Sequence, residues 1–227
     1  MEAQLLTGCK FSYFPLTGRG EAPRLALVIG GVQFTDNRVN FKEWAPIKPS
    51  TPWGALPVLE LADGTQVGQQ RPLLRFLGKK LGMYPTDDML AMRCDELMDV
   101  LDELQGKINS AGQGLEQAEK EAKRKEFIET GPGAEMLTRI DAFIAKHGAN
   151  GYAVGDSLTV ADLMAFAMIS FFISGFFDGV PSTALDRYDN IQALRKLVGS
   201  IPQVVKYLDD MEEPHASYAP LRAARDL

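Results

Sequence analysis

The order of strand-like and helix-like segments along the chain constrains its fold most. Short apolar segments predict four strands, all within the first third of the chain, over residues 10–14, 33–39, 58–61 and 65–67. A helical pattern over residues 20–30 separates the first two strands, and another over residues 70–81 follows the last two. A strand, a helix and a strand in succession favour parallel pairing, whereas Asp63-Gly64 between the last two strands is typical of a tight hairpin.

The remainder of the chain predicts helices and no convincing strand. They are expected over residues 86–110, 115–129, 134–146, 159–173, 191–198 and 202–211. Thr159 and Asp162 have the spacing of a capping box at the start of the fourth of these helices. Gly82-Met83-Tyr84-Pro85 is the natural linker, because glycine ends one helix and proline can open the next. The predicted fold is α/β plus all-α: a thioredoxin-like domain over residues 1–84, then an all-helical domain over residues 85–227.

Composition and charge argue against several classes of partner. The chain has 227 residues and a net charge of −6 without a basic stripe, so nucleic acid is not an expected partner. Its two cysteines, Cys9 and Cys94, lie far apart, and no secretory signal pattern opens the chain, which favours the reducing cytosol. The uncharged run over residues 163–177 is shorter than the roughly twenty residues that a spanning helix needs. It predicts a buried core helix, with no membrane partner.

A tyrosine closes the first predicted strand. Tyr13 stands in Lys10-Phe11-Ser12-Tyr13-Phe14-Pro15, and Gly18-Arg19-Gly20-Glu21 follows after two residues. This order places a phenolic hydroxyl at the carboxyl end of a strand, beside the start of a helix, where open α/β sheets bind ligands. Taken alone, a tyrosine in a strand more often only packs. Gly18-Arg19-Gly20 is not a dinucleotide fingerprint, because Pro23 stands where that motif has glycine.

Three motifs in the right order connect the chain with a known family. They are Tyr13-Phe14-Pro15 with Gly18-Arg19-Gly20-Glu21, then Pro52-Trp53-Gly54-Ala55-Leu56-Pro57-Val58-Leu59, then Gly155-Asp156-Ser157-Leu158-Thr159-Val160-Ala161-Asp162. From about residue 10 to residue 213 the chain resembles cytosolic glutathione transferases, most closely the sigma-like class that includes the haematopoietic type of prostaglandin D synthase. The resemblance implies a cytoplasmic homodimer that conjugates its co-substrate glutathione to a hydrophobic electrophile without a metal. A synthase-like variant would isomerise a peroxide instead.

The resemblance assigns catalysis to Tyr13, with Arg19 as an assisting cation. A thiol has a pKa near 8.5, and lowering that pKa by about two units requires about 2.7 kcal/mol in favour of the thiolate. One hydrogen bond to a charged group, worth roughly 1.5–3 kcal/mol, is of that size. A neutral tyrosine hydroxyl can donate this bond, whereas a carboxylate would repel the sulfur.

The resemblance assigns six further residues to the glycyl and cysteinyl parts of glutathione: Trp44, Lys48, Gly54, Ala55, Leu56 and Pro57. Trp44 and Lys48 match contacts to the glycyl end, where a lysine suits a carboxylate as a mobile point charge. The Gly54–Leu56 backbone matches the segment that holds the cysteinyl part, and the Leu56–Pro57 bond is implied to be cis.

Gln69 and Gln70 match the site of the γ-glutamyl end. Gln69 corresponds to a glutamine of the family, and the amide after it is expected at a helix N-terminus, which attracts a carboxylate. Gln70 departs from the pattern, because the family usually has serine there. The long amide could bond the carboxylate differently or obstruct it, so this residue puts glutathione affinity in question.

Asp99, Asp102 and Glu103 lie at positions i, i+3 and i+4 and are expected on one face of a helix. Such a face is usually solvated. The resemblance places it at the dimer interface, with Asp102 or Glu103 reaching the glutathione of the partner subunit. The resemblance implies that in some members this cluster binds a divalent metal. The spacing alone does not specify a metal, so a metal at this face stays an open alternative and none is assigned.

The electrophile is expected between the two domains, beside Phe14, Leu16, residues 107–113 and residues 171–177. Methionines and phenylalanines at helical spacing are more often core than pocket, so the electrophile itself is not identified. One alternative function stays open: a non-catalytic or weakly catalytic binding or structural protein with the same fold, as in lens crystallins of this lineage. Gln70 favours that alternative, and Tyr13, Arg19, Trp44 and Gln69 favour the enzyme.

Overall fold

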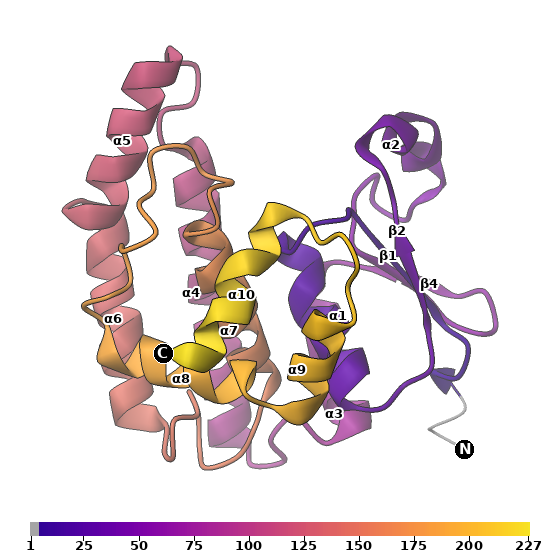
Figure 1. Ribbon diagram of the computed structural model, residues 1–227. Coiled ribbons are helices and arrows are strands. Elements are labelled where there is room, and N and C mark those ends of the chain that lie inside the picture. Colours follow the sequence, from indigo (N-terminus) through magenta and orange to yellow (C-terminus); the bar gives the residue numbers. More distant parts are fainter. Residues whose placement is uncertain (1–4) are drawn as a thin grey trace.

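The N-terminal domain is built on a sheet of four strands within residues 5–227, the part of the chain that this computed structural model describes. β1 (Lys10–Tyr13) pairs in parallel with β2 (Thr35–Arg38) and antiparallel with β3 (Val58–Glu60), which pairs antiparallel with β4 (Gln66–Gly68). The order is β2-β1-β3-β4 (Figure 1). The predicted parallel unit and the predicted hairpin are both confirmed.

Two helices separate this sheet from the helical domain. α1 (Gly18–Ile29) and α3 (Gln70–Leu81) pack against each other and against α7 (Val160–Phe172), as Figure 1 shows. Leu25, Leu73 and Leu77 on these helices are fully buried. Each helix thus has one side against the sheet domain and one side against the helical domain.

A further short helix, α2 (Phe41–Ile47), was not predicted. Pro46 and Pro49 make this stretch resemble a loop, but Pro46 stands in the last turn of the helix. Asn40 caps the helix by accepting the Lys42 N–H at 3.1 Å, and the Glu43 side chain accepts the Asn40 N–H at 3.3 Å. Because β1 and β2 are parallel, α2 follows the same end of the sheet at which Tyr13 stands.

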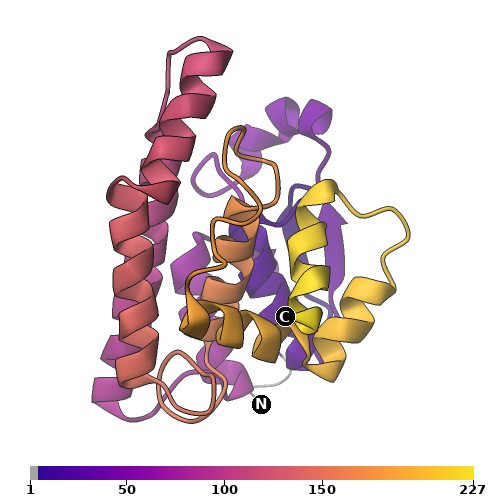
Figure 2. The same cartoon turned by 60° about the vertical axis from the view of Figure 1, so that its left-hand side comes forward.

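Within the described residues, the C-terminal domain consists of helices and the loops that join them. Its helices are α4 (Asp88–Ser110), α5 (Gln117–Glu129), α6 (Pro132–His147), α7 (Val160–Phe172), α8 (Asp189–Gly199), α9 (Pro202–Asp209) and α10 (Ala219–Ala223). In Figure 2, α4, α5 and α6 form an upright layer on one side, and α7 lies between that layer and α1. The predicted fold class and the six predicted helices are confirmed, whereas α10 is too short to show a helical period. The boundary between residues 84 and 85 stays a prediction.

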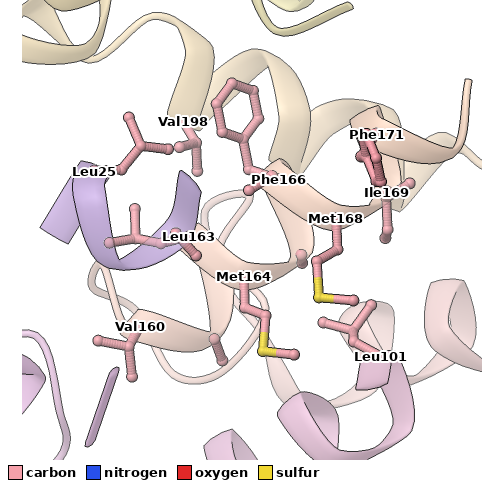
Figure 3. Packing of buried hydrophobic residues seen from close by; sticks show 14 of the residues in the cluster. Leu25, Leu101, Val160, Leu163, Met164, Phe166, Met168, Ile169, Phe171 and Val198 are labelled. Atoms are coloured by element: carbon pink, nitrogen blue, oxygen red, sulfur yellow. The ribbon is translucent and has the colours of Figure 1, made fainter. Parts of the chain in front are cut away.

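α7, which contains residues 163–172 of the uncharged run, forms the centre of the molecule. Every residue of α7 is buried, and its side chains contact Leu25 of α1, Leu101 of α4 and Val198 of α8 (Figure 3). A helix that is apolar all round belongs in a core, so the predicted core helix is confirmed. Among residues 5–227, no helix combines the length and the apolar character that crossing a membrane requires.

A buried carboxylate fixes the start of α7. Asp162 accepts the Thr159 N–H and O–H, both at 2.7 Å, and the Ala153 N–H at 2.6 Å. The predicted capping box is therefore present. Burial, opposed by these hydrogen bonds, raises the pKa of Asp162 to about 6.

Candidate active site

Tyr13 is held by the first turn of α1. Its hydroxyl oxygen accepts the backbone N–H of Arg19 at 3.1 Å, and the residue is only 7% exposed. A Cβ atom at Gly20 would lie 2.2 Å from Cδ1 of the Tyr13 ring, so the ring packs directly on the glycine backbone. Gly18 has a φ of +58° and also brings its backbone close to the hydroxyl. The two glycines are therefore explained by the approach of α1 to the tyrosine.

The Tyr13 hydroxyl is suited to donate rather than to ionise. Burial raises the pKa of Tyr13 above its ordinary value of 10, although the Arg19 amide and the Arg19 charge oppose this shift. The tyrosine stays protonated at neutral pH. The hydroxyl oxygen accepts the Arg19 N–H through a lone pair, so the hydroxyl proton stays available to donate a hydrogen bond to a ligand.

Three arginines meet three aspartates of α4 across the domain boundary. The pairs are Arg19–Asp102, Arg71–Asp99 and Arg75–Asp95. Arg71 also reaches Asp102 at 3.5 Å. The arginine partners of Asp99 and Asp102 thus belong to the same chain and do not require a second copy. Within the described residues, no group of three or more histidine, cysteine or carboxylate side chains is arranged to hold a metal ion.

These ion pairs form one wall of a polar pocket of about 390 Å³, whose other lining residues include Gln69, Gln70 and Pro72. Gln69 precedes α3 with a φ of +74°, a conformation that non-glycine residues seldom adopt. Backbone strain of this kind is concentrated at functional sites. The Gln70 side chain is 3% exposed, and both of its polar atoms are buried without a hydrogen-bond partner. The pocket therefore offers cations, the amides of a helix N-terminus and an unpaired side-chain amide.

A second group of predicted residues lies around the loop that follows α2. The Trp44 ring contacts Phe14, the residue after Tyr13, with ring centroids 5.7 Å apart. Lys48 extends over Gly54, where a Cβ atom would lie 3.6 Å from the lysine Cε. Ala55 is exposed, and the Leu56–Pro57 peptide bond is cis, as the resemblance implies. The structure thus connects this group with Tyr13 through Phe14.

Glu103 has other partners than Asp99 and Asp102, although all three stand on α4 at the predicted spacing. It pairs with Lys107 at 2.8 Å and lines a separate pocket of about 290 Å³ between α4 and α6. The three carboxylates stand at the predicted spacing on α4 but have different partners: Asp99 and Asp102 pair with arginines of α3 and α1, and Glu103 lines the pocket toward α6. Lys107 also belongs to this separate pocket.

Aromatic side chains at the end of α7 lie beside Tyr13. A Cβ atom at Gly18 would lie 3.0 Å from the Tyr13 hydroxyl and 3.6 Å from Cε1 of Phe171. The ring of Phe171 packs on that of Phe176, with centroids 4.6 Å apart, and Phe176 is exposed. Phe171 therefore lies close to Tyr13, and Phe176 joins it to the surface, whereas the electrophile site between the two domains stays a prediction.

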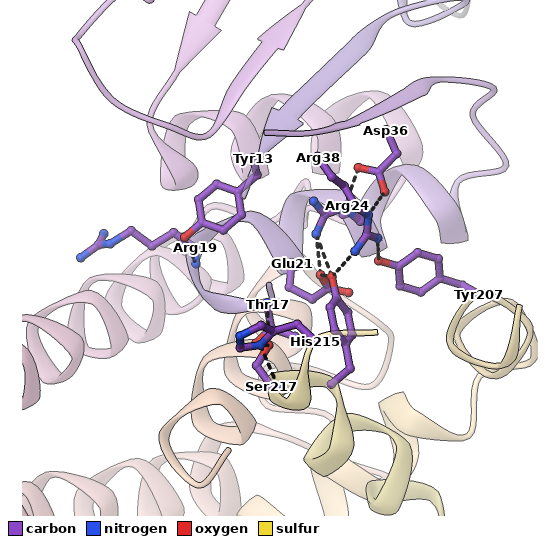
Figure 4. A network of polar contacts seen from close by, with 11 residues as sticks. Tyr13, Thr17, Arg19, Glu21, Arg24, Asp36, Arg38, Tyr207, His215 and Ser217 are labelled. Atoms are coloured by element: carbon purple, nitrogen blue, oxygen red, sulfur yellow. Dashed lines mark hydrogen bonds and ion pairs between the residues drawn. The ribbon is translucent and has the colours of Figure 1, made fainter. Parts of the chain in front are cut away.

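Sequence analysis missed a buried polar network beneath the site (Figure 4). The Glu21 carboxylate of α1 accepts from Arg24 at 2.6 Å and from the Tyr218 hydroxyl at 2.8 Å. Arg24 also donates to Asp36 of β2 at 2.9 Å. Buried charges require partners, and Glu21 and Arg24 on the mostly apolar helix α1 were the available signal. Their partners in β2 and near the C-terminus could not be read from spacing.

Comparisons with known proteins agree with this geometry. Residues 104–211 match the family described as "Glutathione S-transferase, C-terminal domain". A probable glutathione S-transferase of Caenorhabditis elegans is 34% identical over 88% of this chain and 94% of its own length. An S-crystallin of Nototodarus sloanii is 28% identical over 86% of this chain and 93% of its own. The structure of a prostaglandin synthase D of Nilaparvata lugens superposes with a TM-score of 0.81 at 27% identity, covering 91% of this chain and all of that one.

Fold, motifs and relatives therefore lead to one assignment. The sigma-like resemblance noted in the sequence is confirmed by these relatives. The sheet domain, the helical domain and the placement of Tyr13 agree with it. The chain belongs to the glutathione S-transferase family of transferase enzymes.

Proposed function

We propose that this protein conjugates glutathione to hydrophobic electrophiles, with Tyr13 as the donor that stabilises the glutathione thiolate. The observation that carries the proposal is the Tyr13 hydroxyl, which is buried, protonated and oriented by the Arg19 amide at 3.1 Å. The thiol releases its proton to solvent, and the thiolate accepts the tyrosine hydrogen bond. Its sulfur then attacks the electrophilic carbon; with chlorodinitrobenzene the C–S bond forms, the C–Cl bond breaks and chloride leaves. Arg19 adds positive charge near the sulfur and favours the anion.

The same proposal places the rest of glutathione along the surface from α2 to α3. The γ-glutamyl carboxylate lies in the polar pocket at the N-terminus of α3, with Gln69 and Gln70. The glycyl carboxylate lies beside Trp44 and Lys48. The cysteinyl part lies along residues 54–57. The electrophile then approaches from the side of Phe171 and Phe176.

We also propose a homodimer. Trp53 is 70% exposed on the sheet domain, and the pocket between α4 and α6 is lined mostly by apolar atoms of Leu97, Val100, Ile140 and Phe143. An exposed aromatic side chain and an apolar pocket are the features that a self-complementary contact would bury. Glu103 lines this pocket. In the proposed dimer, Asp102 and Glu103 of α4 would contribute to the glutathione site of the partner subunit.

A reducing compartment, the cytoplasm, is proposed for the protein. Cys9 and Cys94 are buried and free, which is typical of proteins that do not depend on disulfides. The alternative function, a structural or binding protein, has support from the S-crystallin relative and from Gln70. The side-chain amide of Gln70 is buried without a hydrogen-bond partner, and Gln70 lines the pocket proposed for the γ-glutamyl carboxylate.

One experiment separates the two functions. The purified protein is passed over immobilised glutathione and then assayed for conjugation of glutathione to chlorodinitrobenzene. The enzyme is expected to be retained, to be eluted by free glutathione and to form the conjugate above the rate of the uncatalysed reaction. Retention without conjugation would favour the binding protein, and absence of both would contradict a glutathione site altogether.

A further inference from the structure

The C-terminal segment, residues 212–227, is tied to the start of α1 by two hydrogen bonds. The Thr17 N–H donates to Oγ of Ser217 at 3.1 Å, and the Tyr218 hydroxyl donates to Oε2 of Glu21 at 2.8 Å (Figure 4). All four residues are buried. Thr17 stands immediately before α1 and Glu21 in its first turn, so the segment holds this turn from two sides.

Tyr218 is also connected to the strand beside Tyr13. Its hydroxyl accepts from Arg38 at 3.0 Å, and Arg38 is the residue of β2 that pairs with Tyr13 of β1. The next residue, Val39, donates its N–H to the Tyr13 carbonyl at 2.8 Å. The C-terminal segment therefore contacts both structures that flank Tyr13: the first turn of α1 and the end of β2.

The first turn of α1 in turn sets the position of the Tyr13 ring and hydroxyl. Arg19 is the second residue of α1, so its N–H has no acceptor within the helix and donates to the Tyr13 hydroxyl instead. The ring packs on Gly20, where there is no room even for a methyl group. A displacement of this turn must therefore move the hydroxyl, break its bond to Arg19, or both.

We propose that Ser217 and Tyr218 are positioning residues for the catalytic tyrosine. Through Thr17, Glu21 and Arg38 they fix the turn and the strand between which Tyr13 is held. This inference rests on the proposed role of Tyr13. It assigns to the C-terminal segment a function beyond packing: it orients the donor of the thiolate hydrogen bond from the other end of the chain.

The first test does not depend on glutathione. Ser217→Ala, Tyr218→Phe and the double variant are compared with Tyr188→Phe, which removes another buried hydroxyl that bonds the Ala134 carbonyl and has no link to α1. Hydrogen exchange is measured at the Arg19 amide, whose acceptor is the Tyr13 hydroxyl. The double variant is expected to exchange this amide about tenfold faster, as an amide does when its local structure opens, and Tyr188→Phe should leave it unchanged. Unchanged exchange in the folded double variant would overturn the proposal.

The second test distinguishes positioning from general stability. The double variant is expected to lower kcat about tenfold, within the effect of a small misplacement, with the KM for glutathione unchanged. In a Tyr13→Phe background the same two substitutions should cost little more, because residues that act through one group are not additive. Full additivity would show that Ser217 and Tyr218 act independently of Tyr13. If Tyr13→Phe alone kept full activity, the proposed function would fall, while the exchange result would still decide whether the segment positions Tyr13.

Discussion

Gly20→Ala tests whether the close approach of α1 to Tyr13 is essential. The new methyl group would lie 2.2 Å, 2.3 Å and 2.7 Å from Cδ1, Cγ and Cβ of Tyr13. Ordinary contacts are 3.4–4 Å, so the ring or the helix must move by about 1 Å or more. Because Tyr13 is in the core, this movement cannot be absorbed by rotation into solvent.

The size of the effect follows from that movement. Overpacking of a core typically costs about 1–3 kcal/mol, which corresponds to a fall in Tm of about 2–12 °C for a chain of this length. A displacement of about 1 Å at a catalytic group can lower turnover on the order of a hundredfold. Both quantities are measured on the same protein, by calorimetry and by the conjugation assay.

Gly106→Ala is the matched control. Gly106 also lies in a helix, but a Cβ atom there has no neighbour within 4 Å. The control should gain up to about 1 kcal/mol from helix propensity and keep wild-type turnover. If Gly20→Ala behaved like Gly106→Ala in both assays, the tyrosine would not be held by the first turn of α1, and the reasoning would be refuted.

Three further predictions concern other parts of the molecule. Gln70→Ser should tighten glutathione binding by about 1 kcal/mol in a calorimetric titration, because a hydroxyl replaces an unpaired amide beside the carboxylate site; equal affinities would show that Gln70 already makes the contact. The pKa of Asp162 is raised to about 6 from an ordinary 3.8, so its contribution to folding stability should fall as the pH rises between those values, by at most about 1.4 kcal/mol per pH unit. Asp162→Asn should lack this slope in chemical denaturation, and a slope equal to that of the wild type would assign it to other groups. Trp53→Ala should convert a sedimenting dimer into a monomer, whereas a dimer of unchanged affinity would exclude Trp53 from the interface.

Much of the fold could be predicted because local patterns agree with tertiary packing. Most of the uncharged run lies in α7, and Asp63-Gly64 lies in the turn between β3 and β4. Both could be predicted because apolar patterning and turn chemistry depend on residues close together in the sequence. α2 was not predicted, because Pro46 and Pro49 are typical of a loop, although Asn40 and Glu43 cap a helix there. The structure of the C-terminal segment was missed for a different reason. Its contacts join residues as far apart in the sequence as Thr17 and Ser217, and such pairs cannot be predicted from a local sequence pattern.

In the candidate site too, local features could be predicted from the sequence, whereas contacts between distant residues could not. Tyr13 was singled out because it ends a strand that is followed by a helix start, whereas its catalytic role and the choice of Gln69 came from the family resemblance. The partners of the acidic helix face were not predictable. The spacing predicts that Asp99 and Asp102 are neighbours on α4. Their ion pairs with Arg71 and Arg19 depend on the packing of α3 and α1 against α4, which the spacing does not predict.

The central claim, that Tyr13 stabilises the glutathione thiolate, is tested most directly by titrating the bound thiol. The ultraviolet absorbance of the thiolate is followed against pH in complexes of glutathione with the wild-type protein and with Tyr13→Phe. The wild-type complex is predicted to ionise about two pH units below the value near 8.5 of a free thiol, and the Tyr13→Phe complex close to that free value. Ionisation at the same pH in both complexes would contradict the account.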